Sequence, residues 1–457
     1  MSLMVSISGI RGIVGESLTP EKIVQYSSAY AEYCRRGTIF IGRDGRITGK
    51  TIQDLVTATL LQMGCNVIDL GICPTPTVAF AVEKLHGAGG IAVTASHNPM
   101  IWNGMKFFAA TGLFLNADEN KNFWQIAERG NFRYKPWNEQ GKLSVNHEFI
   151  HEHVQAVLNL PYLSPSAIAK KKFKIVLDCV NASGGAVVPS LLKKLGCEVI
   201  ELNCNLSGIF AHTPEPIPEN LTELCSAVLA HKADLGIAID PDSDRLVLIT
   251  EEGKPFVEEY TIVSAVKFIL EAEKKLNRTN HSIVVNLSTT RAVEDIASLY
   301  NATVVRTPVG EINVAKKMKE IGAIIGGEGS GGVILPAVHL GRDALVGVGL
   351  FLQLLADFNG KASELKHSLP FYEIVKNKIE LGSLQPDEIL KKLHEKYSRT
   401  ETTNFDDGLK IDFAESWVHL RKSNTEPIIR IIAEAKTRRE ASALVERFQK
   451  EIVSHDE

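Results

Sequence analysis

The sequence has no Cys-x-x-Cys pair among its seven cysteines, no apolar run near 18 residues, and no charged start followed by an apolar stretch. The first absence argues against zinc sites and disulfide scaffolds. The cysteines are odd in number and lie mostly within apolar runs, so we expect buried, reduced thiols in a cytoplasmic protein. The other absences argue against a membrane span and a signal peptide.

Positive charge is not in excess either. Lys and Arg number 50 and Asp and Glu number 54, which gives a formal net charge of −4. This balance argues against a nucleic-acid-binding protein that relies on bulk positive charge, but it leaves room for a local basic pocket. The chain has 457 residues, 44% of them hydrophobic. It is therefore long enough for roughly three domains, and a monomer and a homodimer are both open.

The chain does contain an internal repeat. Residues 59–70 (TLLQMGCNVIDL) and 190–202 (SLLKKLGCEVIEL) each read as a helix end, a glycine and a β-rich run, and residues 298–310 (SLYNATVVRTPVG) form a fainter third copy. Each copy begins with a strand, has a Thr-Pro pair after its second strand, and ends with a third strand. Three tandem βαβαβ units predict an α/β fold with mixed or parallel sheets and helices on both faces.

The C-terminal residues differ from the repeat. Residues 376–457 read as a helix, a hairpin, a strand and a final helix, which predicts a small α+β domain after a linker at 367–375. We therefore expect four domains, over residues 1–145, 146–250, 251–367 and 368–457. In open α/β sheets, ligands bind at the carboxyl ends of the strands. The loops after the three third strands are the first places to look for a site.

The second of these loops is rich in aspartate. Asp240, Asp242 and Asp244 follow the apolar run 235–239. In an extended chain, alternate side chains point to one side, where three carboxylates would repel one another. Such a set suits a hard divalent cation, Mg²⁺ first and Ca²⁺ or Mn²⁺ next. A polar surface turn is the alternative, and an EF-hand fits poorly because its glycine and distal glutamate are missing.

The first loop ends its strand with Ser96. No Gly-x-Ser-x-Gly elbow surrounds this serine, and His97, its neighbour in the chain, is expected to face away from it. Ser96 could instead cap a helix. Opposite a metal-binding carboxylate cluster it would suit phosphate chemistry, since a phosphoserine carries about −1.5 to −2 charges at pH 7. Arg11, Lys106 and Arg245 are candidates for neutralising that charge.

Two further loops suit a sugar phosphate. The third-strand loop GGEGSGG (326–332) has glycines that allow close approach of a ligand, and Glu328 and Ser330 suit sugar hydroxyls. The segment RKSNTEPIIR (421–430) combines arginines, hydroxyls and an amide, which suits a phosphate cradle, with a solvated charged loop as the alternative. The candidates in this cradle are Arg421, Ser423, Asn424, Thr425 and Arg430.

Together these segments resemble the α-D-phosphohexomutase superfamily of phosphoglucomutases, phosphomannomutases and phosphoglucosamine mutases. The similar segments, in the family's order and at its spacing, are SGIRG (8–12), GRDGR (42–46), TASHNPMIWNGMK (94–106), DPDSDR (240–245), GGEGSGG (326–332) and RKSNTEPIIR (421–430). The resemblance covers nearly the whole chain. It implies four domains around one cleft, three of them related and one distinct.

The resemblance also implies a role for each candidate residue. Ser96 would be the phosphoserine, and Mg²⁺ would be held by the Ser96 phosphate with Asp240, Asp242 and Asp244. The matching positions at the phosphotransfer centre are Arg11, Lys106 and Arg245. The implied substrate-binding residues are Glu328 and Ser330 of the sugar loop and Arg421, Ser423, Asn424, Thr425 and Arg430 of the last domain, and we add Thr307 and Gly310 as candidates.

The implied activity is that of an isomerase that interconverts hexose 1-phosphate and hexose 6-phosphate. The phosphoserine would give its phosphoryl group to the sugar, the 1,6-bisphosphate would turn around, and the other phosphoryl group would return to Ser96. A hexose 1,6-bisphosphate would act as activator. Two rival hypotheses stay open. A phosphatase would not need the loops at 326–332 and 421–430, and a paralogue without activity would only bind sugar phosphates.

Two positions depart from the family pattern. Pro241 replaces a glycine of the metal loop, and Gly332 takes the place of a histidine suspected of acid–base or phosphate contacts in several members. His339, seven residues on, is a candidate replacement, and Lys106 and His97 are candidates for proton transfer. The GGEGSGG variant favours glucosamine phosphate over glucose and mannose phosphates as the substrate.

Overall fold

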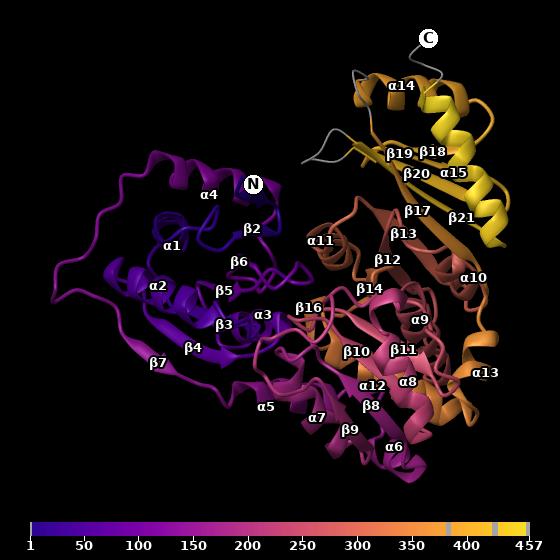
Figure 1. Cartoon of the computed structure of the whole chain (residues 1–457), viewed down its shortest axis with the longest axis horizontal. Helices are drawn as coiled ribbons and strands as arrows, with labels where there is room; N and C mark the ends of the chain where they lie inside the picture. The colour runs from indigo at the N-terminus through magenta and orange to yellow at the C-terminus, as the bar shows by residue number, and fades with distance from the viewer. Residues whose placement is uncertain (1, 381–384, 423–427, 454–457) are drawn as a thin grey trace.

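The computed structural model describes residues 2–380, 385–422 and 428–453. The described residues form four β-sheets, which follow one another along the chain. In Figure 1 the indigo N-terminal unit lies at one end, the magenta and orange units lie beside each other, and the yellow C-terminal unit lies above the orange one. The predicted α/β architecture of three related units and one distinct unit is confirmed.

The first sheet has seven strands in the order β1-β2-β6-β5-β3-β4-β7. Alternate residues of β3 face opposite sides: Ile39 and Ile41 pack against one set of helices, and Phe40 packs against α3. The strands are β1 (Met4–Ser6), β2 (Gly9–Ile13), β3 (Ile39–Arg43), β4 (Val67–Ile72), β5 (Gly89–Val93), β6 (Trp102–Ala109) and β7 (Leu143–Val145). The helices are α1 (Pro20–Tyr33), α2 (Gly49–Gln62), α3 (Thr75–Lys84) and α4 (Ala117–Arg129).

The second sheet has the order β11-β10-β8-β9 and the third the order β13-β12-β14-β15-β16. Their strands are β8 (Lys174–Asp178), β9 (Glu198–Leu202), β10 (Leu235–Ile239), β11 (Leu246–Thr250), β12 (Ser282–Asn286), β13 (Thr303–Thr307), β14 (Ile325–Glu328), β15 (Gly332–Leu335) and β16 (His339–Arg342). Their helices are α5 (Phe149–Leu158), α6 (Pro165–Lys171), α7 (Gly184–Lys194), η1 (Pro218–Asn220), α8 (Thr222–His231), α9 (Glu259–Lys275), α10 (Ala292–Ser298), α11 (Glu311–Ile321), α12 (Ala344–Phe358) and α13 (Ala362–His367).

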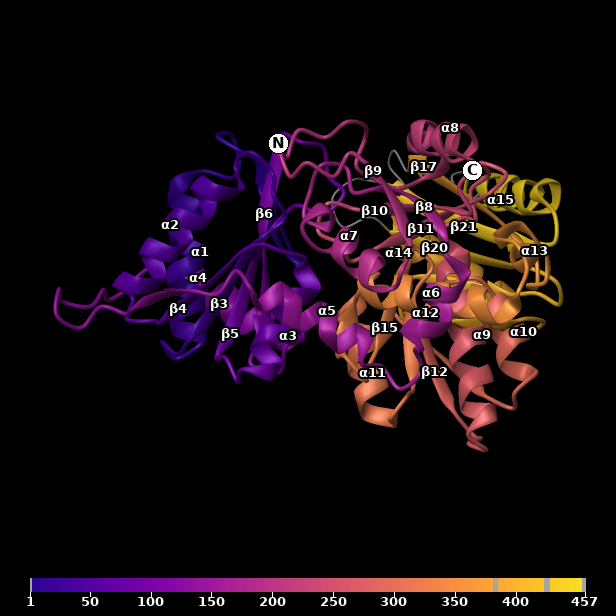
Figure 2. The same ribbon diagram turned by 90° about the horizontal axis from the view of Figure 1, so that it is seen from below.

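Apolar residues of the second and third units form one continuous core, to which β8, α9 and α12 all contribute. The first unit is joined to this core through α3, which lies beside α5 in both views (Figure 2). The second and third units therefore pack as one body, with the first unit docked against it.

The three related units share one sheet plan. The triplets β4-β3-β5, β9-β8-β10 and β13-β12-β14 are parallel, and each is extended by an antiparallel strand, β6, β11 or β15. The internal repeat is thus confirmed. One detail differs: the helix after the second Thr-Pro pair starts only at Thr222, because residues 203–217 form an irregular segment.

The C-terminal sheet is antiparallel, in the order β17-β21-β20-β19-β18. Its elements are β17 (Glu373–Glu380), α14 (Pro386–Tyr397), β18 (Thr402–Asn404), β19 (Leu409–Asp412), β20 (Trp417–Lys422), β21 (Ile428–Ala435) and α15 (Arg438–Val453). The predicted helix, hairpin, strand and final helix are all present. The linker expected at 367–375 is shorter, because β17 starts at Glu373 and pairs with β21 along its length.

The structure bears on two expectations from composition. All seven cysteines are free thiols, and five of them are buried. Among the described residues, we find no helix with the length and the apolar character that crossing a membrane requires.

Candidate active site

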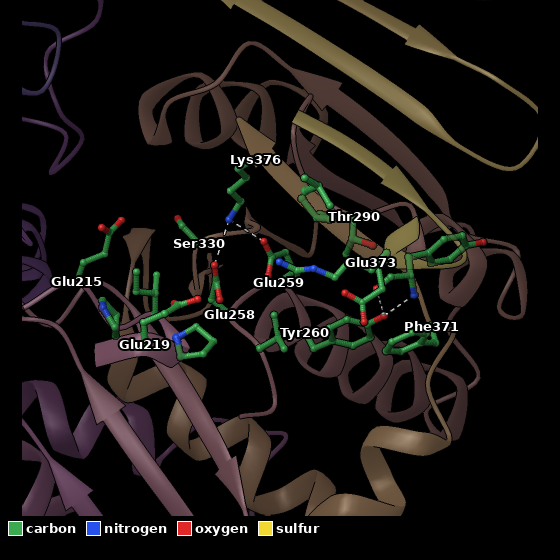
Figure 3. A pocket seen from close by; sticks show the side chains of 18 of the residues that line it. Glu215, Glu219, Glu258, Glu259, Tyr260, Thr290, Ser330, Phe371, Glu373 and Lys376 are labelled. Carbon is green, nitrogen blue, oxygen red and sulfur yellow. Dashed lines mark hydrogen bonds and ion pairs between the residues drawn. The ribbon is translucent and has the colours of Figure 1, made fainter. Parts of the chain in front are cut away.

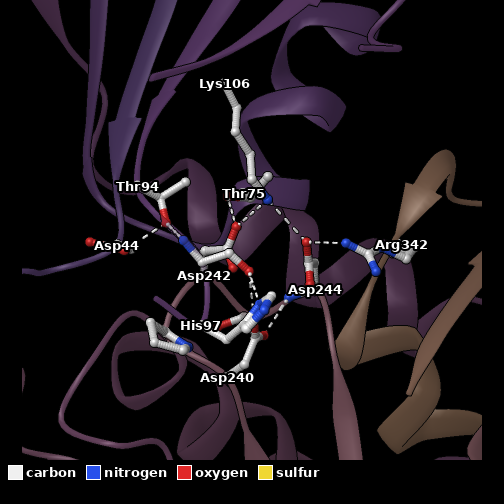
Figure 4. Close-up of polar contacts among 12 residues, drawn as sticks. Asp44, Thr75, Thr94, His97, Lys106, Asp240, Asp242, Asp244 and Arg342 are labelled. Carbon is white, nitrogen blue, oxygen red and sulfur yellow. Dashed lines mark hydrogen bonds and ion pairs between the residues drawn. The ribbon is translucent and has the colours of Figure 1, made fainter. Parts of the chain in front are cut away.

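The loops after the equivalent third strands meet at one cavity, and Figure 4 shows the first two of them with Arg342. Ser96 follows β5, Asp240 follows β10, and Glu328 ends β14. The Ser96 Oγ lies 3.3 Å from Asp240 Oδ2, and Arg342 bonds to both Asp244 and Glu328. A cavity of about 170 Å³ lies here, and its polar lining includes Arg11, Ser96, Lys106, Arg245, Gly310, Glu328 and Arg342.

Ser96 sits in a turn and not at a helix start. Between β5 and β6 the chain forms no helix, so the helix-capping alternative does not apply. Ser96 has a φ of +48°, in the left-handed region that non-glycine residues enter at a cost. Its N–H donates to Thr94 Oγ1 at 2.8 Å. The turn brings His97 Nδ1 to 3.3 Å from Ser96 Oγ, so the expectation that His97 faces away is wrong.

A buried arginine holds the shape of this loop. The guanidinium of Arg46 donates to four backbone carbonyls, those of Ser96 (2.5 Å), Asn98 (2.7 Å), Pro99 (2.9 Å) and Trp102 (2.9 Å). Its Nε also donates to Asp44 Oδ2 at 3.0 Å. Burial raises the pKa of Asp44, while the charge of Arg46 opposes that rise. The serine is therefore presented on a loop whose backbone is fixed by hydrogen bonds.

A turn also brings the three aspartates together. The carbonyl of Asp240 accepts a hydrogen bond from the N–H of Ser243 at 3.0 Å, with Pro241 at the second position of the turn, where proline is favoured. Pro241 thus suits this loop. The sequence suggested an extended chain with the three carboxylates on one side, and that conformation is wrong. The turn nevertheless brings the three carboxylates together. One potential ligand atom from each aspartate lies within 4.8 Å of the others.

The donor set fits a hard cation. The Oδ1 atoms of Asp242 and Asp244 are buried and have no hydrogen-bond partner, although buried polar atoms are normally satisfied. Burial and the charges of Asp244 and Asp242 raise the pKa of Asp240 well above its usual range. A divalent cation among these carboxylates would satisfy the free oxygens and stabilise the ionised form of Asp240.

Basic side chains flank the aspartates. Lys106 Nζ lies 2.6 Å from Asp242 Oδ2 and 3.1 Å from Asp244 Oδ2. Burial alone would raise the pKa of Asp242, but the ammonium of Lys106 lowers it. Arg245 Nε lies 3.7 Å from Asp244 Oδ1, and Arg11 donates to Asn98 Oδ1 at 3.1 Å. The three carboxylates thus lie next to basic side chains, an arrangement that suits a phosphoryl group bound together with a metal ion.

His97 is neutral in this setting. Burial, followed by the positive charges of Arg245 and Arg11, lowers its pKa to about 2. Its Nε2 lies 4.0 Å from Glu215 Oε1, and its side chain is 28% exposed. The Nδ1 of a neutral imidazole can accept a hydrogen bond from the serine hydroxyl.

The predicted sugar loop is held by its neighbours. Glu328 accepts hydrogen bonds from Asn286 Nδ2 at 2.8 Å, from the Gly310 N–H at 3.1 Å and from the Arg342 guanidinium at 2.9 Å. Gly310 lines the cavity. Thr307 lies at the end of β13, and its hydroxyl donates to the carbonyl of Pro308 at 3.1 Å. Of these two substrate-binding candidates, the structure brings Gly310 and not Thr307 to the cavity wall.

A larger pocket of about 640 Å³ opens next to this cavity (Figure 3). Arg245 lines both spaces, and Ser330 lines the larger one. On its far side Lys376 of β17 pairs with Glu258 at 3.1 Å and with Glu259 at 2.8 Å. This pocket runs from Arg245 of the metal loop and Ser330 of the sugar loop to β17 and Arg438 of the C-terminal unit, so it provides room for a ligand that spans both.

The C-terminal candidates are only partly described. Arg421 of β20 and Arg430 of β21 stand opposite each other in the sheet. Arg421 Nε lies 2.9 Å from Asp407 Oδ2, which also accepts the N–H of Val309 at 2.9 Å. Ser423, Asn424 and Thr425 lie outside the described residues. Arg421 is therefore tied to the third unit through Asp407.

All four units of this chain match domains of known proteins. The phosphoglucomutase/phosphomannomutase α/β/α domains I, II and III match residues 4–134, 151–253 and 258–372, and the C-terminal domain of the same proteins matches residues 374–451. A probable phosphoglucosamine mutase of Methanopyrus kandleri is 34% identical over 96% of both chains. The chain belongs to the phosphoglucomutase/phosphomannomutase family. It is an isomerase of the phosphohexomutase type.

Other members of the family are named for different substrates. A phosphoglucomutase/phosphomannomutase of Thermococcus kodakarensis is 35% identical over 96% of both chains. A phosphoglucomutase/phosphomannomutase family protein of Burkholderia thailandensis superposes with a TM-score of 0.85 at 24% identity, covering 99% of this chain and 98% of that one. These relatives agree on the family, and their names differ in the sugar phosphate.

Several residues of this phosphohexomutase site escaped sequence reasoning. The motif GRDGR (42–46) contains Arg46, but the motif alone indicates no role for this arginine. Thr75 belongs to the first Thr-Pro pair of the repeat, and in the structure it donates to Asp242 Oδ2 at 2.8 Å. His339 is no replacement for the missing histidine. It is buried, its Nε2 lies 3.1 Å from Asp343 Oδ2, and it does not line the cavity. The sequence around Arg342 contains no motif that indicates a role for this arginine, which ends strand β16.

Proposed function

We propose that this phosphohexomutase interconverts glucosamine 1-phosphate and glucosamine 6-phosphate through a phosphoserine at Ser96. The observation that carries the proposal is the contact of Ser96 Oγ with Asp240 Oδ2 at 3.3 Å, inside a ring of basic side chains. A phosphoryl group on this oxygen would sit between the three aspartates and the cations. The Ser96 loop, fixed by Arg46, would hold that group in one place.

Mg²⁺ is the cofactor that the donor set suits, held by Asp240, Asp242 and Asp244 with an oxygen of the Ser96 phosphate. When bound, it neutralises charge on the oxygens of the transferring group. The chain supplies the remaining positive charge through Arg11, Lys106 and Arg245. Since these groups are in place before the sugar arrives, little reorganisation is needed in the reaction.

In the first half-reaction, the 6-hydroxyl oxygen of the 1-phosphate attacks the phosphorus on Ser96. The new P–O bond forms as the bond to Ser96 Oγ breaks, the hydroxyl proton leaves the sugar, and Ser96 Oγ takes up a proton. His97 is the residue that the geometry favours for passing this proton to Ser96 Oγ, because its Nδ1 is 3.3 Å from that oxygen while Lys106 is bound to two carboxylates. After the 1,6-bisphosphate turns around, the reverse steps return the other phosphoryl group to Ser96.

The C-terminal unit would bind the phosphate that is not reacting. Arg421 and Arg430 support this role, because they stand opposite each other on β20 and β21. Two neighbouring guanidinium groups suit bidentate binding of phosphate. The large pocket that runs toward this unit could accommodate the sugar between the two phosphate sites.

The experiment compares glucosamine, glucose and mannose 1-phosphates, each with Mg²⁺ and a trace of the matching 1,6-bisphosphate. We expect isomerisation with the highest kcat/KM for glucosamine 1-phosphate, and no turnover by Ser96→Ala. A preference for glucose or mannose would overturn the substrate assignment. Release of inorganic phosphate without isomerisation would indicate a phosphatase, and binding without turnover would indicate a paralogue without activity.

A further inference from the structure

Arg342 is the side chain that connects the metal loop to the sugar loop (Figure 4). Its guanidinium donates to Asp244 Oδ2 at 2.8 Å and to Glu328 Oε2 at 2.9 Å. Its Nε donates to Glu311 Oε2 at 2.9 Å, and its backbone N–H donates to Glu311 Oε1 at 2.9 Å. One buried cation is therefore shared by three carboxylates from three different segments.

Gly332 provides the space for this side chain. Gly332 stands opposite Glu328 in the pairing of β14 with β15. A Cβ added at position 332 would lie 2.2 Å from Arg342 Cδ and 2.9 Å from Arg342 Cγ. The stem of Arg342 cannot easily move aside, because its guanidinium is bound at the far end and its backbone at the near end. Any side chain at 332 and the observed position of Arg342 therefore exclude each other.

We propose that Arg342 stands in for the side chain missing at Gly332, as a positioning residue that holds Asp244 toward the metal and Glu328 toward the sugar. This inference rests on the proposed mutase function. A guanidinium suits the task because it is always charged and carries five N–H donors in a fixed plane, which lets it reach several carboxylates at once. For the same reason it cannot exchange protons at neutral pH, so acid–base chemistry stays with another residue.

The carboxylates around Arg342 in turn keep its guanidinium charged. The pKa of Arg342 lies well above its usual range: burial opposes this, and the charges of Asp244, Glu328 and Glu311 outweigh the burial. Arg342 contacts Asp244 through Oδ2, while Oδ1 has no hydrogen-bond partner and lies 3.7 Å from Arg245 Nε. The free oxygen is then available to a cation.

A double-mutant cycle tests the link between positions 332 and 342. Gly332→Ala should lower kcat/KM about tenfold or more in the parent, because the new methyl group displaces Arg342, and should change it less than about twofold in an Arg342→Ala background. Arg342→Ala alone should lower kcat at least about 100-fold, the usual scale for losing a positioned charged donor. Arg342→Lys should recover part of that loss, because the charge returns without the planar fork.

Arg278→Lys is the control. Arg278 follows α9 in the same unit, is 63% exposed and pairs with Glu273 at 3.5 Å away from the cavity, so this variant should stay within about twofold of the parent. Equal effects of Gly332→Ala in both backgrounds would overturn the inference. So would full activity of Arg342→Ala.

Melting temperatures of the parent, Gly332→Ala, Arg342→Ala and the double variant separate this inference from the proposed function. If the parent isomerised no sugar phosphate, the mutase proposal would fail, but the cycle could still be read from the melting temperatures. A melting temperature lowered by Gly332→Ala only when Arg342 is present would support the pairing. Additive shifts would contradict it.

Discussion

The two sides of the active-site cavity are held in different ways. The Ser96 loop is fixed by Arg46, whose guanidinium binds four backbone carbonyls and Asp44. The sugar side is held by ion pairs between side chains: Arg342 with Glu328, and Lys376 with Glu259. Backbone carbonyls cannot leave their loop, whereas carboxylates can exchange one cation for another partner. The serine side is thus held through its backbone, and the sugar side is held through pairs of charged side chains.

This difference suits a reaction in which the intermediate must turn around. The phosphoryl group has to return to the same oxygen, so the serine must not move. The sugar has to present first one end and then the other, so its binding groups must release and bind again. The predictions below test the two kinds of support, from the largest expected effect to the smallest.

Arg46→Gln should be the most damaging change. It removes a buried charge that satisfies four carbonyls and leaves Asp44 unpaired, so we expect a loss of about 3–5 kcal/mol in the free energy of unfolding and loss of activity. Urea unfolding measures the first quantity. Arg36→Gln is the control, since this exposed arginine bonds only to the carbonyl of Arg133. Equal stability of the two variants would mean that Arg46 does not fix the loop.

Thr94→Val tests a smaller part of the same support. Thr94 accepts the N–H of Ser96 at 2.8 Å and donates to Asp44 Oδ2 at 2.6 Å, and valine does neither. We expect a loss of about 2 kcal/mol in stability and a fall in kcat of about tenfold, with KM little changed. Thr59→Val, which removes only a bond to the carbonyl of Leu55 within α2, should leave kcat unchanged. A change in KM alone would point to substrate binding and away from the loop.

Glu259→Gln tests the ion pair on the sugar side through its pH dependence. Burial, then the charge of Glu258, raises the pKa of Glu259 to about 7, although Lys376 opposes the rise. Between about pH 4.5 and 7 the folded chain keeps a proton that the unfolded chain has lost, so this group makes stability fall as pH rises.

The glutamine variant should lose that slope, so its stability relative to the parent should grow by on the order of 1 kcal/mol from about pH 5 to about pH 7. Unfolding at several pH values measures it. Glu252→Gln, at an exposed glutamate paired with Lys254, should show no such trend. A parallel shift of both variants at every pH would contradict the assignment.

Arg421→Gln should have the smallest effect on stability. Arg421 and Asp407 are each about a quarter exposed, so the loss should be within about 0.5 kcal/mol. The KM for the sugar phosphate should rise about tenfold if Arg421 binds the phosphate that is not reacting. Lys422→Gln, at the neighbouring exposed residue that pairs with Asp387, is the matched control and should leave KM unchanged. Equal KM values in the two variants would place phosphate binding elsewhere.

Much of the fold could be read from the sequence, because its signals are local and repeated. The apolar strands and the Thr-Pro pairs recur at matching places in all three copies, and a glycine follows the helix in the first two; the sheet plan follows from these signals. The serine, the three aspartates and the glycine-rich loop were found because each lies directly after a third strand.

What the sequence did not reveal depends on contacts between distant segments. Arg46 acts on carbonyls about 50 residues away, and Arg342 acts on a carboxylate 98 residues away, so no local pattern marks either one. The position of His97 depends on a positive φ at Ser96, which residue type alone does not predict. The place of His339 beside Asp343 and away from the cavity is likewise a result of packing.

The most direct test is to follow phosphate on Ser96. The protein would be incubated with Mg²⁺ and a hexose 1,6-bisphosphate and analysed by mass spectrometry of the peptide that contains Ser96, before and after a chase with glucosamine 1-phosphate. If the bisphosphate carries an oxygen-18 label, we predict one labelled phosphoryl group on Ser96 that the chase replaces with an unlabelled one, because each turnover returns a phosphoryl group from the sugar phosphate to Ser96. Isomerisation at full rate with no phosphate on Ser96 would contradict the phosphoserine mechanism.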